Sequence, residues 1–310
     1  MLRFPEPSRP LQAHGPNLAV AEGPWNERAR SPGDPVQALL LVWVVFVVYG
    51  SLVPLDFRPL ALADAWHRLV ASPWLRIGVE GRADWIANGV LYFPVGFLSV
   101  ALLVRAPRPT PTRTVIALAA GLLFGIALAA AVELTQTAFP PRTVSLNDLF
   151  AEGVGTLIGG MAALTGTRRL HALLAGLRAG GPRLVRVLGP AYALGYAVLA
   201  LFPYDLLLSA AEWGDKLSGP NVGVLLADSA LGSGFVVLGA KLGLEALAFA
   251  PIGAWWVATH ARAHPTQGNG ASAPCALALV LGSLLGLLIE LAQLAIASGV
   301  TQGASMLTRA

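Results

Sequence analysis

The chain has little charge, and this scarcity excludes several classes of protein. Asp, Glu, Lys and Arg make up 12% of its 310 residues, against about a quarter in an ordinary soluble domain. Apolar residues make up 55%, and the mean hydropathy is +0.65. A soluble fold of this size needs more polar surface than so few charges can supply. The composition therefore argues against a soluble enzyme and a disordered chain, and predicts an all-α polytopic membrane protein.

Cysteine and lysine are also scarce. The single cysteine, Cys275, cannot form an internal disulfide or a cysteine metal cluster. Lys216 and Lys241 are the only lysines, so arginine supplies most of the positive charge behind the net +4. No basic run is interleaved with aromatics, and no metalloprotease, nucleophile-elbow or nucleotide-loop motif occurs. The sequence predicts no cofactor, no metal and no nucleic-acid partner.

Long apolar runs predict about seven membrane-spanning helices, because about 20 helical residues cross a hydrocarbon core of roughly 30 Å. The runs are 36–55, 84–104, 114–138, 148–164, 187–208, 240–259 and 276–297. A weaker stretch at 222–238 is expected to re-enter the membrane or lie at its surface. A helix at 62–76 is expected in the interface, with Trp66 and Trp74 at headgroup level.

The predicted segments and their Lys and Arg counts together indicate the orientation in the membrane. A disordered cytoplasmic tail is expected at 1–34, a unit of four spans with the interfacial helix at 35–166, a basic cytoplasmic linker at 167–186, and a unit of three spans at 187–310. With the N-terminus inside, the inner segments hold 13 Lys and Arg and the outer segments 8. This bias predicts a cytoplasmic N-terminus.

Two parts of the chain repeat each other. Phe93-Pro94-Val95-Gly96 is echoed by Ala250-Pro251-Ile252-Gly253, and in each case a Glu-x-x-Gln begins 39 residues after the proline. The match predicts an internal tandem repeat whose second copy is degenerate. Helix kinks or close packing are expected at Pro94, Gly96, Pro251, Gly253, Gly155 and Gly159.

Polar residues gather at one end of the first predicted unit. Glu133 lies within an apolar run, where an unpaired carboxylate costs several kcal/mol. Gln136 shares its helix face, and Arg142 follows closely enough to pair with Glu133. A polar site is therefore expected from Asp84, Asn88, Glu133, Gln136, Arg142 and Asp148. It is either a binding site or a buried network that pins helices together, and no catalytic residue is assigned.

The second copy carries a changed version of this site. Its counterparts are Lys241, Glu245, Glu290 and Gln293. Lys241 and Glu245 stand one helical turn apart and can neutralise each other. No arginine–aspartate loop follows Glu290, so a weaker or altered site is expected there.

The combined spacing resembles the VanZ-like membrane protein family. The resemblance rests on Asp84-x-x-x-Asn88, Phe93-Pro94-x-Gly96, Glu133-x-x-Gln136, Arg142-x-x-Ser145-x-x-Asp148 and Gly155-x-x-x-Gly159. It covers about residues 40–165 and parts of 190–300. It implies a bacterial inner-membrane protein, and the family's namesake is linked to reduced susceptibility to teicoplanin, a lipoglycopeptide that acts on the outer face.

These observations leave several functions open. The first is recognition of a lipid-linked glycan or a lipoglycopeptide among the membrane lipids of the outer leaflet. The second is a membrane hydrolase or transferase that uses Glu133 or Asp148 as general base and Arg142 to stabilise charge. The third is a non-catalytic scaffold for a membrane partner that the sequence does not specify.

Overall fold

The computed structural model describes residues 34–72, 74, 78–104, 109–140, 142, 144–260 and 272–309. All but the last residue of the predicted tail at 1–34 lies outside the described residues. The described chain is almost entirely helical; its two strands, β1 (Val222–Gly223) and β2 (Thr301–Gln302), pair in parallel. Residues 35–179 are called the first half below, and residues 181–309 the second half.

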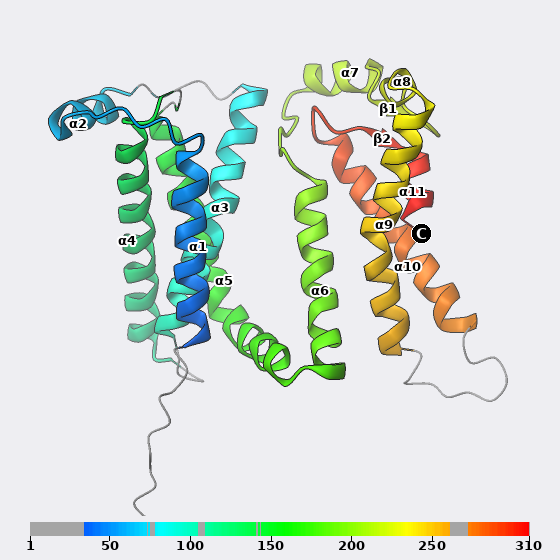
Figure 1. Cartoon of the computed structure of the whole chain (residues 1–310), viewed down its shortest axis with the longest axis horizontal. Coiled ribbons are helices and arrows are strands. Elements are labelled where there is room, and N and C mark those ends of the chain that lie inside the picture. Colours follow the sequence, from blue (N-terminus) through cyan, green and yellow to red (C-terminus); the bar gives the residue numbers. More distant parts are fainter. Residues whose placement is uncertain are drawn as a thin grey trace, which may run out of the picture. The chain divides into compact units, whose positions relative to one another are not determined.

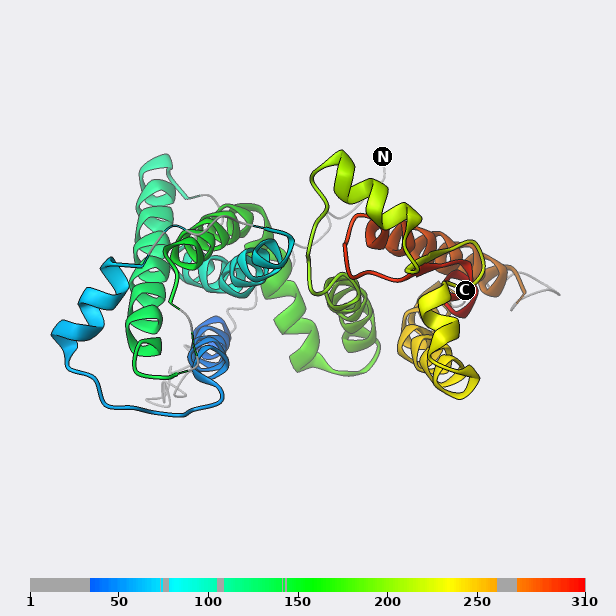
Figure 2. The ribbon, with the colours of Figure 1, turned by 90° about the horizontal axis from the view of Figure 1, so that it is seen from above.

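The first half is a bundle of four long helices (Figures 1 and 2). They are α1 (Pro35–Leu52), α3 (Val79–Leu103), α4 (Pro111–Gln136) and α5 (Leu146–Ala179). Their apolar faces enclose a core that includes Val47, Tyr92 and Ala129, each fully buried. The short α2 (Leu62–Val70) packs against α4 and buries Leu69, while Trp66 stays exposed. The helix predicted at 62–76 is thus present but ends at Val70. Trp74, beyond its end, packs edge-on against Phe150.

Small residues bring α3 and α5 into close contact. A methyl group on Gly155 would overlap the carbonyl oxygen of Gly89, and one on Gly159 would overlap that of Phe93. On α3, a methyl group on Gly96 would overlap the carbonyl oxygen of Thr156. The small-xxx-small pattern therefore does what the sequence predicts, since it lets two backbones approach each other.

The second half has shorter and more irregular elements. Its helices are α6 (Gly181–Ala200), α7 (Ala210–Ser218), α8 (Asp228–Gly232), α9 (Phe235–His260), α10 (Ser272–Leu294) and α11 (Gly303–Thr308). The helix α9 packs against α6, α10 and α11, and α10 also packs against α11. Asp205 fixes the loop after α10, because its carboxylate accepts hydrogen bonds from the backbone and hydroxyl of Ser298 at 2.9 and 3.1 Å. Lys216 donates to two carbonyls of the same loop, those of Ala297 and Gly299.

Six described helices are long and apolar enough to cross a membrane: α1, α3, α4, α5, α9 and α10. The remaining predicted span, 187–208, is not confirmed by the structure. Its helix, α6, ends at Ala200 and is not among the six. The stretch at 222–238 is no single helix, since β1, a loop and α8 occupy most of it. The predicted linker at 167–186 is helical, because α5 runs to Ala179 and α6 begins at Gly181.

The glycines of the two Pro-x-Gly segments provide a matched pair for mutation. Gly96→Ala should lower the thermal unfolding midpoint of the protein in mild detergent, by an overpacking cost of about 1–3 kcal/mol, because its methyl group meets backbone. Gly253→Ala should leave the midpoint unchanged or raise it, since nothing lies within 4 Å of that position. Equal effects of the two substitutions would contradict the close α3–α5 contact.

Candidate functional site

Glu133 is held at the end of α4 by the segment that follows the helix. Its side chain is buried, with 2% of its surface exposed, and Oε2 accepts a hydrogen bond of 3.3 Å from the backbone N–H of Ser145. Ser145 is also the N-cap of α5, where its hydroxyl accepts from the backbone N–H of Asn147 at 3.1 Å. One residue therefore both starts α5 and places its backbone donor on the buried carboxylate.

The first turns of α5 add two more carboxylates beside Glu133. Asp148 is half-buried, and the side-chain amide of Asn88 on α3 is close enough to interact with it. Glu152 is one turn further on and 3% exposed, and its Oε2 has no hydrogen-bond partner. Glu133, Asp148 and Glu152, called the acidic cluster below, lie within electrostatic reach of one another.

A fully buried tyrosine stands next to the acidic cluster. Tyr92 on α3 is within electrostatic reach of Glu152 and Glu133, and its hydroxyl has no hydrogen-bond partner. In the described residues, no ion pair involves any carboxylate of the cluster. Asp84, one turn before Asn88, is exposed and lies within electrostatic reach of Asp148.

Arg142 does not pair with Glu133, contrary to the expectation from the sequence. Its guanidinium donates to the carbonyl oxygen of Gly50 at 2.9 Å, while the amide of Gln136 donates to that of Ser51 at 2.9 Å. Both carbonyls belong to the last turn of α1, where helical partners run out. The free carbonyl groups at the C-terminal end of a helix attract cationic and amide N–H donors. These two side chains therefore cap α1 and do not complete the acidic site.

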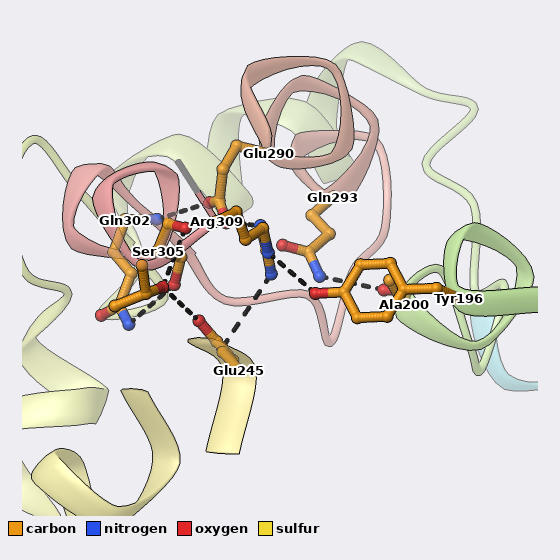
Figure 3. A network of polar contacts seen from close by, with 9 residues as sticks. Tyr196, Ala200, Glu245, Glu290, Gln293, Gln302, Ser305 and Arg309 are labelled. Carbon is orange, nitrogen blue, oxygen red and sulfur yellow. Dashed lines mark hydrogen bonds and ion pairs between the residues drawn. The ribbon is translucent and has the colours of Figure 1, made fainter. Parts of the chain in front are cut away.

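The second half holds a related network (Figure 3). Glu290 on α10 is 3% exposed. Its Oε2 accepts a hydrogen bond of 2.8 Å from the backbone N–H of Gln302, twelve residues later. Ser145 stands at the same separation from Glu133. Gln293 donates to the last carbonyl of α6, that of Ala200, at 2.9 Å. The backbone donor and the helix-capping amide of the first half thus have counterparts here.

An arginine pairs with the carboxylates of the second network. Arg309, just after α11, is 3% exposed and donates through Nη1 to Oε1 of Glu290 at 2.5 Å. Its Nη2 lies 3.9 Å from Oε1 of Glu245, and its Nε donates to the hydroxyl of Tyr196 at 3.1 Å (Figure 3). The expected neutralisation of Glu245 by Lys241 is therefore wrong, because Arg309 and Thr308 contact Glu245 and Lys241 is exposed.

Sequence reasoning missed Arg309, although one signal could have found it. Glu133 and Glu290 are 157 residues apart, and the same interval carries Glu152 to Arg309. At this matched position the first half thus has a negative residue, Glu152, and the second half a positive one, Arg309. The second network holds two carboxylates around a guanidinium, whereas the acidic cluster holds three carboxylates that form no ion pair with a described arginine or lysine.

Residues 36–167 match one protein family model, which is described as VanZ/LLP1. This segment belongs to the VanZ-like family. The VanZ-like segment spans α1 to α4 and most of α5, and it contains the acidic cluster, Asn88 and Tyr92. The second half lies outside the match. No curated protein and no solved structure matches the chain.

The buried Arg309–Glu290 pair yields a prediction about stability. Arg309→Leu should lower the free energy of unfolding by about 3–5 kcal/mol, because it leaves Glu290 buried without its cation. Adding Glu290→Leu should restore most of the loss. The measurement is the unfolding midpoint of the purified full chain in mild detergent.

Arg58 provides the control for this prediction. Its pair with Asp56 is exposed on both sides, so Arg58→Leu should cost less than about 1 kcal/mol. A loss as large for Arg58→Leu as for Arg309→Leu would show that the buried pair is not the cause.

Proposed function

We propose that this VanZ-like membrane protein recognises an amphiphile of the outer leaflet, a lipid-linked glycan or a lipoglycopeptide of the teicoplanin type, through the acidic cluster. The observation that carries the proposal is the burial of Glu133 and Glu152 without a cationic partner among the described residues. Such burial is costly unless a ligand or protons compensate it. A network that only pins helices together has no need of that cost, as the arginine-closed pair of the second half illustrates.

An apolar groove beside the cluster suits the tail of such a ligand. Its volume is about 400 Å³, and Trp74 and Phe150 stand among its lining residues. The remaining lining comes from α4 and α5: Leu122, Ile126, Leu146, Leu149, Gly153, Val154 and Leu157. Asp148 and Glu152 project from the opposite face of the same turns of α5 and do not line the groove. The groove therefore offers a place for an acyl chain at the depth of the cluster.

The proposed location is the bacterial inner membrane with a cytoplasmic N-terminus. The excess of Lys and Arg in alternate segments supports this orientation. It puts the acidic cluster, which lies at the α2 end of the first half, in the outer leaflet. Ligands that act from outside the cell then reach the site without crossing the membrane.

The second half is proposed to be a diverged copy of the first. Several paired features support this besides the motifs. Leu55 and Tyr204 each directly follow a proline and share a φ of 67°. Glu133 and Glu290 each accept from a backbone N–H twelve residues later, and Gln136 and Gln293 each cap a preceding helix.

A susceptibility assay tests the proposed function. Glu133→Gln should abolish the protein's effect on teicoplanin susceptibility in a bacterium that expresses it, because the variant removes the charge and keeps the shape. Asp64→Asn, which alters an exposed carboxylate on α2, should retain the effect. Membrane level of each variant is measured by immunoblot. Full activity of Glu133→Gln at equal membrane level would reject the proposal.

A hydrolase or transferase is the second candidate. Asp148 is half-buried while Glu133 is buried, and two carboxylates in unlike environments can divide acid and base roles. Against it, Arg142 contacts Gly50 and is not placed to stabilise charge at the cluster. Incubation of the purified protein with a lipid-linked glycan decides between them, since an enzyme releases a new headgroup product and a binding protein returns the lipid unchanged.

A further inference from the structure

We infer that the acidic cluster, together with Tyr92, binds an organic cation with N–H donors, an ammonium or a guanidinium group carried by the ligand. This inference rests on the proposed function and names the chemical group that the site recognises. The two halves of the chain carry the argument, because one of them displays the occupied form of the arrangement.

Arg309 shows what the occupied form looks like. Its guanidinium lies between Glu290 and Glu245 and also donates to the hydroxyl of Tyr196. Two carboxylates and a phenol therefore surround one planar cation (Figure 3). Charge-assisted hydrogen bonds of this kind are among the strongest that a protein makes, and they account for the burial of Glu290 and Arg309.

The first half has comparable surroundings without the cation. Glu133 accepts from the backbone N–H of Ser145 just as Glu290 accepts from that of Gln302, twelve residues later in each case. At the position matched to Arg309 stands Glu152, whose Oε2 is buried and has no hydrogen-bond partner. A tyrosine hydroxyl is present here too, since that of Tyr92 is buried near Glu133 and Glu152 and also lacks a partner. The described residues thus supply acceptors at the acidic cluster and no cationic side chain that pairs with it.

The spacing of the carboxylates favours an organic cation over a metal ion. In the described part of the chain, no three His, Cys, Asp or Glu side chains come together in a way that could hold a metal ion. The acidic cluster is nevertheless close enough for its charges to interact. An ammonium or guanidinium group bridges carboxylates through N–H donors that reach further apart than metal–oxygen bonds do.

Binding of small amines to the full-length protein in phosphatidylcholine nanodiscs tests the inference. The probes are ethylammonium and ethylguanidinium chloride, with tetramethylammonium chloride as a cation that has no N–H donor. The readout is the rise of the unfolding midpoint with probe concentration, which measures ligand affinity for the folded state. Saturable stabilisation by either N–H probe, and none by tetramethylammonium, is the expected result.

Variants show whether the acidic cluster is the site. Glu133→Gln and Glu152→Gln should each weaken the binding about tenfold or more, whereas the exposed Asp64→Asn should not change it. Glu152→Arg should abolish binding, because it supplies the guanidinium from within. Should Glu152→Arg fail to fold, the two glutamine variants still decide. Absence of saturable stabilisation, an equal response to tetramethylammonium, or unchanged affinity in both glutamine variants would overturn the inference.

A second arm identifies the source of the cation. Replacing part of the phosphatidylcholine with phosphatidylethanolamine should weaken apparent ethylammonium binding if the lipid's own amine occupies the cluster. If that lipid has no effect, the cation comes from a soluble or glycan-borne amine, and both results agree with amine binding. Failure of the susceptibility assay with intact amine binding removes only the antibiotic role. A phenotype that needs Glu133 without amine binding removes only this inference.

Discussion

Carboxylates at the ends of apolar helices must find donors, and this constraint organises both halves of the chain. Glu133 and Glu290 each lie in the last turn of a long helix and each accept from a backbone N–H twelve residues later. A backbone donor on a returning segment satisfies part of the carboxylate without adding a positive charge. The segment after each helix must therefore fold back over its end, and this brings the next helix start, α5 or α11, against the buried acid.

The negative charge of the buried carboxylates is neutralised in the second half and not in the described residues of the first. In the second half, Arg309 neutralises Glu290 and Glu245 from within the chain. In the first half, Asp148 and Glu152 add negative charge to that of Glu133, and the described residues that face it with donors are Asn88 and the backbone N–H of Ser145. One half therefore contains a complete polar core, while the other keeps an unbalanced one within the VanZ-like segment.

Hydropathy predicts much of this fold, because lipid exposure makes each span apolar over its whole length. The family, the long helices of the first half and the burial of Glu133 follow from that pattern and from the motifs. Arg142 was assigned to the wrong partner because sequence proximity ignores the unsatisfied carbonyls at the end of α1, which attract its guanidinium. Arg309 was missed because its partners, Glu245 and Tyr196, come from distant helices. The full length of α5 was missed because the arginines after residue 166 end the apolar run while the helix continues.

The close approach of α3, α4 and α5 has a consequence for how the acidic side chains are held. Thr156 on α5 faces Gly96 on α3 and Gly125 on α4, and a methyl group on either glycine would overlap it. Three backbones are thereby fixed one turn beyond Glu152, and the carboxylates cannot relax by spreading their helices apart. The free-energy cost of bringing these carboxylates together is therefore part of the cost of folding. If the cluster binds a cation as proposed, the ligand meets a rigid site and loses little of its binding free energy to reorganisation of the bundle.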